Sequence, residues 1–331
     1  MMVAQLKDLF LKDNFFLDAT TIATFIRWGA EFTIGSSYQS TSAFYDTIGI
    51  SDNSPLFSLS SSLIIIFSFY IYLKKASAKY IYFGEFSLLV FLTFLSTVFM
   101  TMLSKELLVV LVIVPFIYFA EKGTIGLLIW SLLAIVYATY FRTYWFLFIA
   151  EFWLLYLVFR STRSALLLAT VVPLSLFALS VFFGVSLGID LDSFRTKVND
   201  IRLEGNVDDA RTMIMPWLPG GGLIKGWLNV CITWITLMVP LPLILMGTPY
   251  YLIISYAVIV MYYKIWRRVT IEIKQKNSEV VSACAALVLA YVTIQSLFEP
   301  DYGSYVRHLS PFYPLIFFII ISRPHSRTSH T

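Results

Sequence analysis

The stretch that decides the fold class is Ala165–Leu187, which reads ALLLATVVPLSLFALSVFFGVSL and contains no charged residue. At about 1.5 Å of rise per residue, a helix of this length crosses a hydrocarbon core of about 30 Å. The whole chain shares this character, since 58% of its 331 residues are apolar and only 13% are charged. Average soluble domains carry about 25% charged residues. The composition excludes a soluble globular enzyme and a disordered chain, and it predicts a membrane protein.

Uncharged runs of this kind recur along the chain. Because an open sheet cannot satisfy its backbone groups in lipid, each run is expected to be a helix. The sequence therefore predicts an all-α polytopic membrane protein, a single bundle of about nine transmembrane helices. The predicted spans are Pro55–Leu73, Phe86–Leu103, Leu107–Ala120, Ile125–Phe141, Thr143–Phe159, Ala165–Leu187, Pro249–Tyr263, Val280–Phe298 and the short Pro311–Ile321.

The positions of lysine and arginine predict the orientation, because short cytoplasmic loops are rich in both. The densest basic run, Lys264–Lys276, is placed in the cytoplasm, and the polar stretch Gly188–Gly226 then lies on the outer side. An odd number of crossings must join them, although the apolar block between them is long enough for two. We therefore predict that Trp227–Met246 is a re-entrant or interfacial segment bent at Pro240 and Pro242.

The same orientation places the N-terminal segment on the outer side with no earlier span to carry it there. Either a first span is missing from this chain, which we expect, or Ile22–Ile34 lies in the interface despite Arg27 and Glu31. The predicted organisation is a periplasmic or interfacial segment over 1–54, transmembrane helices over 55–187, a large periplasmic loop over 188–226, the bent segment over 227–246, C-terminal transmembrane helices over 249–322 and a cytoplasmic tail over 323–331.

Several classes of function find no support in the sequence. The net charge of +4 is too small for a nucleic-acid footprint. Cys231 and Cys284 lie in apolar runs, and His308 is the only histidine outside the C-terminal tail, so a multi-histidine metal site is excluded. Asp190 and Asp192 form a carboxylate pair that could hold a divalent metal, but such pairs are common by chance. No glycine-rich phosphate loop, zinc motif or dinucleotide fingerprint is present, so no cofactor and no metal are expected.

Charges at a membrane bundle are costly and therefore usually functional. Arg307 and His308 precede the last span in the predicted loop Phe298–Pro311, on the proposed outer side. A guanidinium fits phosphate oxygens in pairs, although Arg307 could also be an interface anchor. Arg142 is the only charge between two predicted spans, on the side expected to be poor in cations. Both arginines are therefore candidate functional residues.

Three further charges are open to two interpretations each. Lys105 and Glu106 stand between two spans, where they could pair with one another or belong to a site. Glu151 lies in the middle of a predicted span, as a hydrogen-bonding strut or as a catalytic or proton-handling carboxylate.

The outer polar stretch shows helical periodicity. Apolar side chains recur at Leu191, Phe194, Val198 and Ile201, and the polar side chains Arg195, Asn199 and Arg202 fall on another face. This pattern predicts a periplasmic amphipathic helix with its apolar side on the membrane. Its polar face is either solvated or an anion-binding lid over a lipid headgroup.

Four short motifs, in this order, resemble the bacterial oligosaccharide repeat-unit polymerases, namely the Wzy-like O-antigen and EpsG-like exopolysaccharide families. The motifs are Ser104–Glu106, Tyr140–Trp145, Asn206–Thr212 and Gly303–His308, and the likeness runs from about residue 30 to the end. The resemblance implies an enzyme of the bacterial inner membrane, multi-pass and active at its periplasmic face. It would join polyprenyl-diphosphate-linked repeat units as a glycosyltransferase-type polymerase, without a metal. Possible partners are a chain-length regulator and a flippase, besides membrane lipid.

The resemblance also implies that outer arginines, here Arg142, Arg211 and Arg307, hold the diphosphate or the glycan. Catalytic roles are expected for Arg307, Arg142, His308 and Glu151, and substrate or diphosphate binding for Arg211, Arg195, Arg202, Lys105, Tyr144 and Tyr305. The general base stays open among Glu106, Glu151, Asp209, Asp301 and His308. Alternative functions are a lipid-linked oligosaccharide flippase, another polyprenyl-linked-sugar-dependent glycosyltransferase and an O-antigen ligase.

Overall fold

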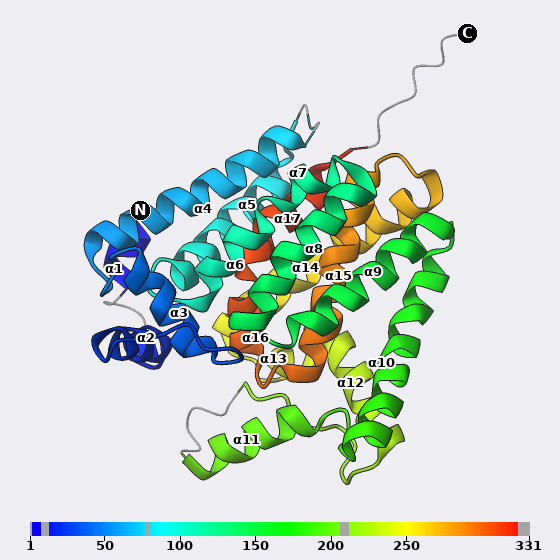
Figure 1. The fold of residues 1–331 in the computed structure, drawn as a ribbon. Coiled ribbons are helices and arrows are strands. Elements are labelled where there is room, and N and C mark those ends of the chain that lie inside the picture. Colours follow the sequence, from blue (N-terminus) through cyan, green and yellow to red (C-terminus); the bar gives the residue numbers. More distant parts are fainter. Residues whose placement is uncertain (1, 8–12, 77, 79, 206–211, 324–331) are drawn as a thin grey trace. The chain divides into compact units, whose positions relative to one another are not determined.

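In the computed structural model, which describes residues 2–7, 13–76, 78, 80–205 and 212–323, the regular elements are helices (Figure 1). Within those ranges the only strand-like pairing is an isolated bridge between Met213 and Asp301. The predicted all-α class is therefore confirmed. The chain forms two compact units: the first comprises Met1–Ile149, Asn277–Cys284 and Arg307–Thr331, and the second Ala150–Lys276 and Ala285–Val306.

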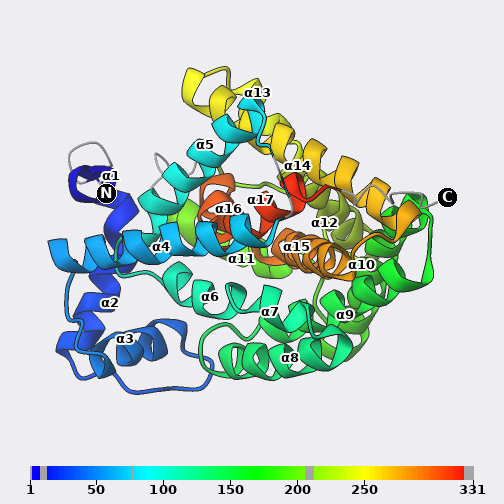
Figure 2. The ribbon, with the colours of Figure 1, turned by 90° about the horizontal axis from the view of Figure 1, so that it is seen from above.

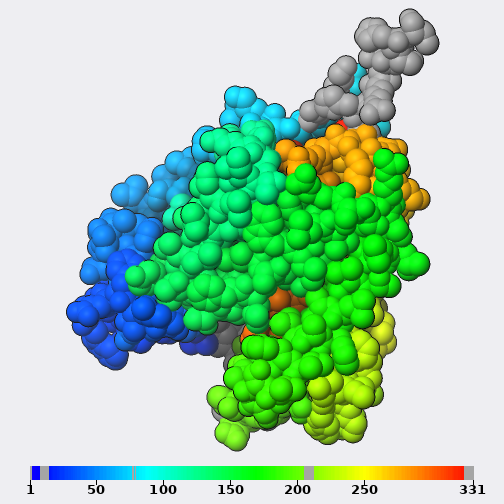
Figure 3. Space-filling view, turned by 45° about the vertical axis from the view of Figure 1, so that its right-hand side comes forward, coloured from blue at the N-terminus to red at the C-terminus, as the bar shows by residue number. Residues whose placement is uncertain are grey.

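Six helices among the described residues are long and apolar enough to cross a membrane. They are α4 (Pro55–Lys75), α5 (Phe83–Met100), α8 (Gly123–Tyr140), α10 (Ala165–Leu187), α15 (Glu279–Phe298) and the run Tyr302–Ile321, which joins α16 (Tyr302–Leu309), a 3-10 turn η4 (Ser310–Phe312) and α17 (Tyr313–Ile321). α8 lies on the outside of the molecule (blue-green in Figure 3), where Ile125, Leu132 and Val136 are exposed as in a lipid-facing helix. The count of nine spans stays a prediction.

Proline interrupts two of the predicted apolar segments. The third predicted span is divided into α6 (Lys105–Ile113) and α7 (Phe116–Ala120), because Pro115 has no N–H to continue the ladder. The segment predicted to bend at Pro240 and Pro242 consists of α12 (Leu223–Met238) and α13 (Leu241–Leu245). No single straight helix runs through it. Its depth in the membrane stays a prediction.

The segment before the last span differs from the expectation. The predicted loop Phe298–Pro311 instead contains the helix α16, so Arg307 stands on a helix. The reason is a face of apolar and aromatic side chains at helical spacing, Tyr302, Tyr305 and Leu309, each at most 2% exposed. Burial of this face outweighs the breaking tendency of Gly303 in the first turn.

In the first unit, short N-terminal helices pack on one another and on later helices. They are α1 (Met2–Leu6), a 3-10 turn η2 (Asp13–Phe16), α2 (Leu17–Arg27) and α3 (Ser37–Thr47), and α2 and α3 lie side by side in both views (Figures 1 and 2). α1 packs on α4 and α5, α2 on α3, and α3 on α6. Ser42 Oγ donates to the Ile22 carbonyl over 3.0 Å, and Tyr45 OH donates to the Ser104 carbonyl over 2.8 Å. These bonds fix α2 to α3, and α3 to the residue that precedes α6.

The second unit contains most of α9 (Trp145–Ser161), together with α10, α11 (Ser193–Gly205), α12, α13, α14 (Pro249–Gln275) and most of α15. The amphipathic helix predicted from the sequence is present as α11, but two of the three side chains of its polar face, Arg195 and Asn199, are buried, while Arg202 is exposed. Arg195 and Asn199 are 1% and 2% exposed, whereas Ile201 on the apolar face is 68% exposed. Arg195 Nη1 donates to Thr233 Oγ1 over 2.7 Å and to the Ser296 carbonyl over 3.0 Å. Arg195 and Asn199 therefore pack on protein, where they form hydrogen bonds with buried polar groups.

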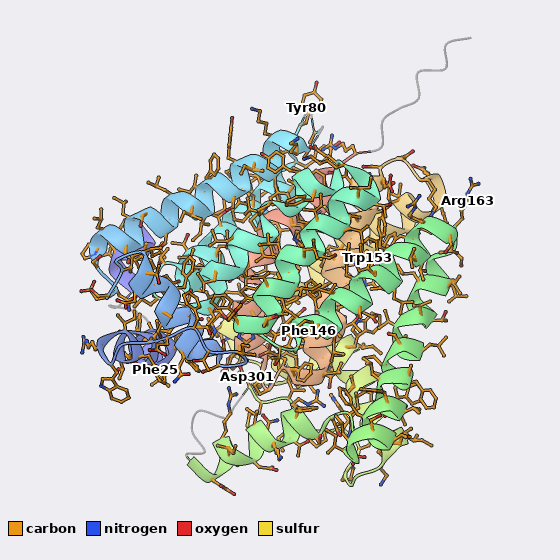
Figure 4. All side chains as sticks on the ribbon, viewed as in Figure 1. Phe25, Tyr80, Phe146, Trp153, Arg163 and Asp301 are labelled. Carbon is orange, nitrogen blue, oxygen red and sulfur yellow. The ribbon has the colours of Figure 1, made fainter. Side chains whose placement is uncertain are left out.

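Cations predicted to be cytoplasmic gather at one end of the first unit. Lys75 pairs with Glu121 at 2.6 Å, and Arg323 donates to the carbonyl of Tyr80 over 2.7 Å. Figure 4 shows Tyr80 at this end and Phe25, in α2, toward the other. Which end of the first unit faces the cytoplasm stays a prediction from the positive-inside rule.

In the second unit, the segments predicted to be cytoplasmic and those predicted to be outside also lie at opposite ends. Figure 4 shows Arg163 and Asp301 at its opposite ends. α11 belongs to the Asp301 end, because Arg202 Nη1 lies 2.5 Å from Asp301 Oδ2. The end of α14 belongs to the other, since Lys276 Nζ donates to the carbonyl of Phe159 in α9, close to Arg163. Which end faces the cytoplasm is a prediction from the charges.

Single-cysteine labelling tests this orientation. In a variant whose Cys231 and Cys284 are replaced by alanine, cysteine at the exposed position 204 is expected to react with an impermeant maleimide in intact spheroplasts. Cysteine at the exposed position 274 is expected to react only after permeabilisation. The reverse pattern would overturn the orientation, and equal labelling from one side would place both ends on that side.

Candidate functional site

Six ionisable side chains of the first unit meet at the N-terminal end of α6, and we call them the charged cluster: Asp18, Lys105, Glu106, Arg142, Arg307 and His308. Asp18 comes from α2, and Lys105 and Glu106 open α6. Arg142 lies between α8 and α9, and Arg307 and His308 lie at the end of α16. The cluster therefore joins segments almost three hundred residues apart in the chain.

The start of α6 explains why the cluster forms there. Ser104 adopts an extended N-cap conformation, and its side chain accepts a hydrogen bond from the Leu107 N–H over 3.3 Å. Glu106 then falls in the first turn, where the helix dipole favours a negative charge. The carboxylate in turn attracts cations from the neighbouring segments.

Glu106 is the buried centre of the cluster, with a side chain 1% exposed. Its Oε1 atom lies 2.7 Å from Arg142 Nη2 and 3.3 Å from His308 Nε2, and among the described residues Oε2 has no hydrogen-bond partner. Burial would raise the pKa of Glu106, but the opposing charges of Arg307 and Arg142 hold that pKa well below its usual range. So low a pKa makes the Glu106 carboxylate a weak base, which disfavours it among the candidate bases.

Arg142 is held inside the protein. Its side chain is 5% exposed, Nη2 donates to Glu106, and Nη1 donates to Tyr144 OH over 2.9 Å. The predicted direct contact between Arg142 and a diphosphate would require the guanidinium to leave Glu106. Arg142 is therefore a buried member of the cluster that holds Glu106, and Tyr144 is its second hydrogen-bond partner.

Arg307 belongs to a more exposed half of the cluster, which also contains Asp18, Lys105 and His308 and which we call the open half. Its Nη2 atom lies 2.9 Å from Asp18 Oδ2, and the two side chains are 23% and 16% exposed. Tyr38 OH donates to the other oxygen of Asp18, and Lys105 Nζ lies 3.7 Å from the centre of the Tyr38 ring. The side chain of His308, in the same half, is 18% exposed.

The electrostatics of the open half favour an anion. Burial lowers the pKa of Lys105 to about 8, so the lysine is charged at neutral pH. Burial would raise the pKa of Asp18, but Arg307, Lys105 and the Tyr38 hydrogen bond lower it on balance. Burial and the neighbouring Asp18 raise the pKa of Tyr38, which keeps its hydroxyl a donor. Three cations against two carboxylates leave the charged cluster with an excess positive charge.

The other predicted site residues lie in the second unit. Glu151 accepts a hydrogen bond from Ser175 Oγ over 3.0 Å, and Tyr305 OH is hydrogen-bonded to Tyr262 OH. Arg202 pairs with Asp301. Arg195 is the buried arginine of α11. Arg211 and Asp209 lie outside the described residues.

Sequence reasoning missed Asp18 and Tyr38. Both lie in the N-terminal segment, which the sequence sets apart from the transmembrane bundle. Asp18 is one of several charges there, and nothing in its neighbours marks it as the partner of Arg307. Only the packing of α2 on α3, and of α3 on α6, brings it to the site.

The carboxylate pair Asp190 and Asp192 has a structural role. Asp190 Oδ2 accepts from the Gly222 N–H over 2.8 Å, and Asp192 Oδ2 accepts from Asn229 Nδ2 over 2.8 Å. Among the described residues, no group of three histidine, cysteine, aspartate or glutamate side chains is placed to hold a metal ion. The pair instead ties the turn before α11 to the start of α12.

Comparison with known proteins finds no matching family model, no matching curated protein and no matching solved structure. The function is therefore argued from the charged cluster and its chemistry.

Proposed function

We propose that this protein polymerises polyprenyl-diphosphate-linked oligosaccharide repeat units at the periplasmic face of a bacterial inner membrane. The observation that carries the proposal is the charged cluster, in which Arg307, Lys105 and His308 adjoin one another at one end of apolar helices. A lipid diphosphate presents its charge at that depth, with its polyprenyl chain among the helices. The repeat-unit polymerases that the motifs resemble use such a substrate.

The chemistry assigns a role to each member of the open half. An acceptor hydroxyl oxygen attacks the anomeric carbon, the bond from that carbon to the diphosphate oxygen breaks, and the electron pair leaves with the diphosphate. Arg307 and Lys105 stabilise the charge that develops on the leaving group. His308 takes the proton of the hydroxyl, since imidazole is the side chain used most often as a general base. Glu106, which is paired with Arg142, lies 3.3 Å from His308 Nε2 and holds the imidazole in position.

A flippase is the leading alternative of another class. It would be expected to carry cations along helices that face a central passage. The charged cluster instead lies at helix ends, at the start of α6 and the end of α16. This placement supports chemistry at one face of the membrane. An O-antigen ligase or another glycosyltransferase would use the same leaving group with a different acceptor.

The proposal is tested by deleting the gene and separating surface polysaccharide on a gel. The expected result is loss of long polymer with retention of single repeat units, and recovery of the ladder when the gene is restored. Accumulation of unflipped precursor on the cytoplasmic side would indicate a transporter and contradict the proposal. A ladder unchanged by deletion would also contradict it.

A pH dependence follows from Lys105. Because its pKa is about 8 in the ligand-free protein, the lysine loses its proton and its charge as the pH rises through that value. Polymer formation at limiting substrate is therefore expected to fall about tenfold between pH 7 and pH 9, the effect of losing one charge-assisted contact. In Lys105→Arg the charge persists, and this loss should be absent. Comparing the two proteins at each pH cancels any ionisation of the substrate, and identical profiles would show that Lys105 does not contact it.

A further inference from the structure

The charged cluster contains two arginine–carboxylate pairs that differ in burial and in hydrogen bonding. The Arg142–Glu106 pair is hydrogen-bonded at 2.7 Å, with side chains 5% and 1% exposed. The Arg307–Asp18 pair is as close, at 2.9 Å, but Asp18 Oδ2 lacks the alignment of a hydrogen bond, and the side chains are 23% and 16% exposed. An incoming anion would therefore exchange with Asp18 far more readily than with Glu106.

Asp18 is surrounded by cationic and hydroxyl donors, the groups that bind an anion. Its carboxylate takes the guanidinium of Arg307 on one oxygen and the hydroxyl of Tyr38 on the other, and Lys105 adds a third favourable charge. Guanidinium, ammonium and hydroxyl donors are also what a phosphate oxygen requires. A diphosphate diester carries two negative charges, so it gains more from these donors than a single carboxylate does.

We infer that the Asp18 carboxylate occupies the place of a substrate phosphate at Arg307, Lys105 and Tyr38, and that a diphosphate binds by displacing it. The inference rests on the proposed function, because it assigns this anion site to the diphosphate of the lipid-linked sugar. Asp18 turns away from Arg307 when the substrate enters, and Tyr38 OH donates to a phosphate oxygen in its place. In the empty state Asp18 neutralises Arg307 and keeps other anions from the site. Asp18 is therefore a competitor that lowers affinity and raises selectivity for the doubly charged ligand.

Titration of inorganic pyrophosphate into the full-length protein in lipid nanodiscs, at fixed ionic strength and pH 7.5, tests the inference. Asp18→Asn removes the competing charge but keeps the shape of the side chain. Its Kd for pyrophosphate is expected to be about two- to fivefold lower than that of the unmodified protein, the effect of relieving one partly exposed ion pair. Arg307→Ala should weaken binding in both backgrounds.

Two further variants separate competition from simple structural support. Glu121→Gln makes the same change in the Lys75–Glu121 pair at the other end of the first unit, and it should leave the Kd unchanged. Tyr38→Phe removes the hydroxyl that orients Asp18 and would also serve the ligand, so its binding should weaken. Thermal unfolding of each variant shows whether it is folded.

The outcomes are distinct. Tighter binding by folded Asp18→Asn supports the inference. Equal or weaker binding by that variant, with Arg307 still required, overturns the inference and leaves the proposed diphosphate site intact. If Asp18→Asn does not fold, Asp18 is a structural residue and the inference fails. If pyrophosphate binds no better to the unmodified protein than to Arg307→Ala, the inference and the assigned diphosphate site both fail.

Discussion

Arg307→Ala is expected to abolish polymer formation while the protein still inserts into the membrane and accumulates. The guanidinium stands at the open half of the charged cluster, where it would meet the charge that develops on the departing diphosphate. Losing a charge-assisted contact of this kind should raise the barrier by about 3–4 kcal/mol, by analogy with losing one oxyanion donor. That corresponds to a rate lower by about a hundred- to a thousandfold. Polymer gels of complemented deletion strains measure the effect.

Two controls make this result specific. Arg307→Lys keeps the charge but loses the planar fork, so it should recover only part of the activity. Lys75→Ala removes a cation from the opposite end of the first unit and should leave the polymer ladder unchanged. Polymer of normal length and abundance from Arg307→Ala would show that Arg307 is only an interface anchor, as the sequence alone allowed.

Glu106→Ala is expected to have the largest effect on stability. The substitution leaves the guanidinium of Arg142, 5% exposed, without its carboxylate. Breaking a buried ion pair by removing one partner typically costs about 3–5 kcal/mol, because the remaining charge is buried without compensation. Thermal unfolding in detergent, followed by loss of the soluble monomer, should therefore occur at a clearly lower temperature.

The matched variant removes both charges. In Glu106→Leu/Arg142→Met no buried charge is left alone, so most of the lost stability should return while activity stays low. The exposed pair Lys75–Glu121 offers the comparison, since Glu121→Ala should change the unfolding temperature little. If Glu106→Ala were as stable as the unmodified protein, Arg142 would not depend on Glu106 and the support assigned to this pair would be wrong.

The parts of the fold that the sequence predicted are those set by local patterns. Long apolar runs specify helices such as α4, α10 and α15, because backbone groups in lipid must be satisfied within one segment. The break before Pro240 follows from the missing N–H of proline. Lys105, Arg142, Arg307 and His308, which the sequence singles out beside hydrophobic runs, also meet in one cluster, and their functional importance stays a prediction.

The parts that the sequence did not predict depend on partners distant in the chain. The helical pattern of α11 is confirmed, but only Thr233 and the Ser296 carbonyl explain why Arg195 on its polar face is buried. Arg142 looked like a free cation, yet Glu106 encloses it. Asp18 could not be matched with Arg307 from a single sequence, because nothing local distinguishes it from the other N-terminal charges.

The most direct measurement of the central claim uses purified protein in lipid vesicles, supplied with lipid-linked repeat units from a strain that lacks the gene. The account predicts oligomers of increasing length, one polyprenyl diphosphate released for each new glycosidic bond, and no products from Arg307→Ala. Movement of the lipid-linked units across the bilayer without new bonds or released diphosphate would contradict it.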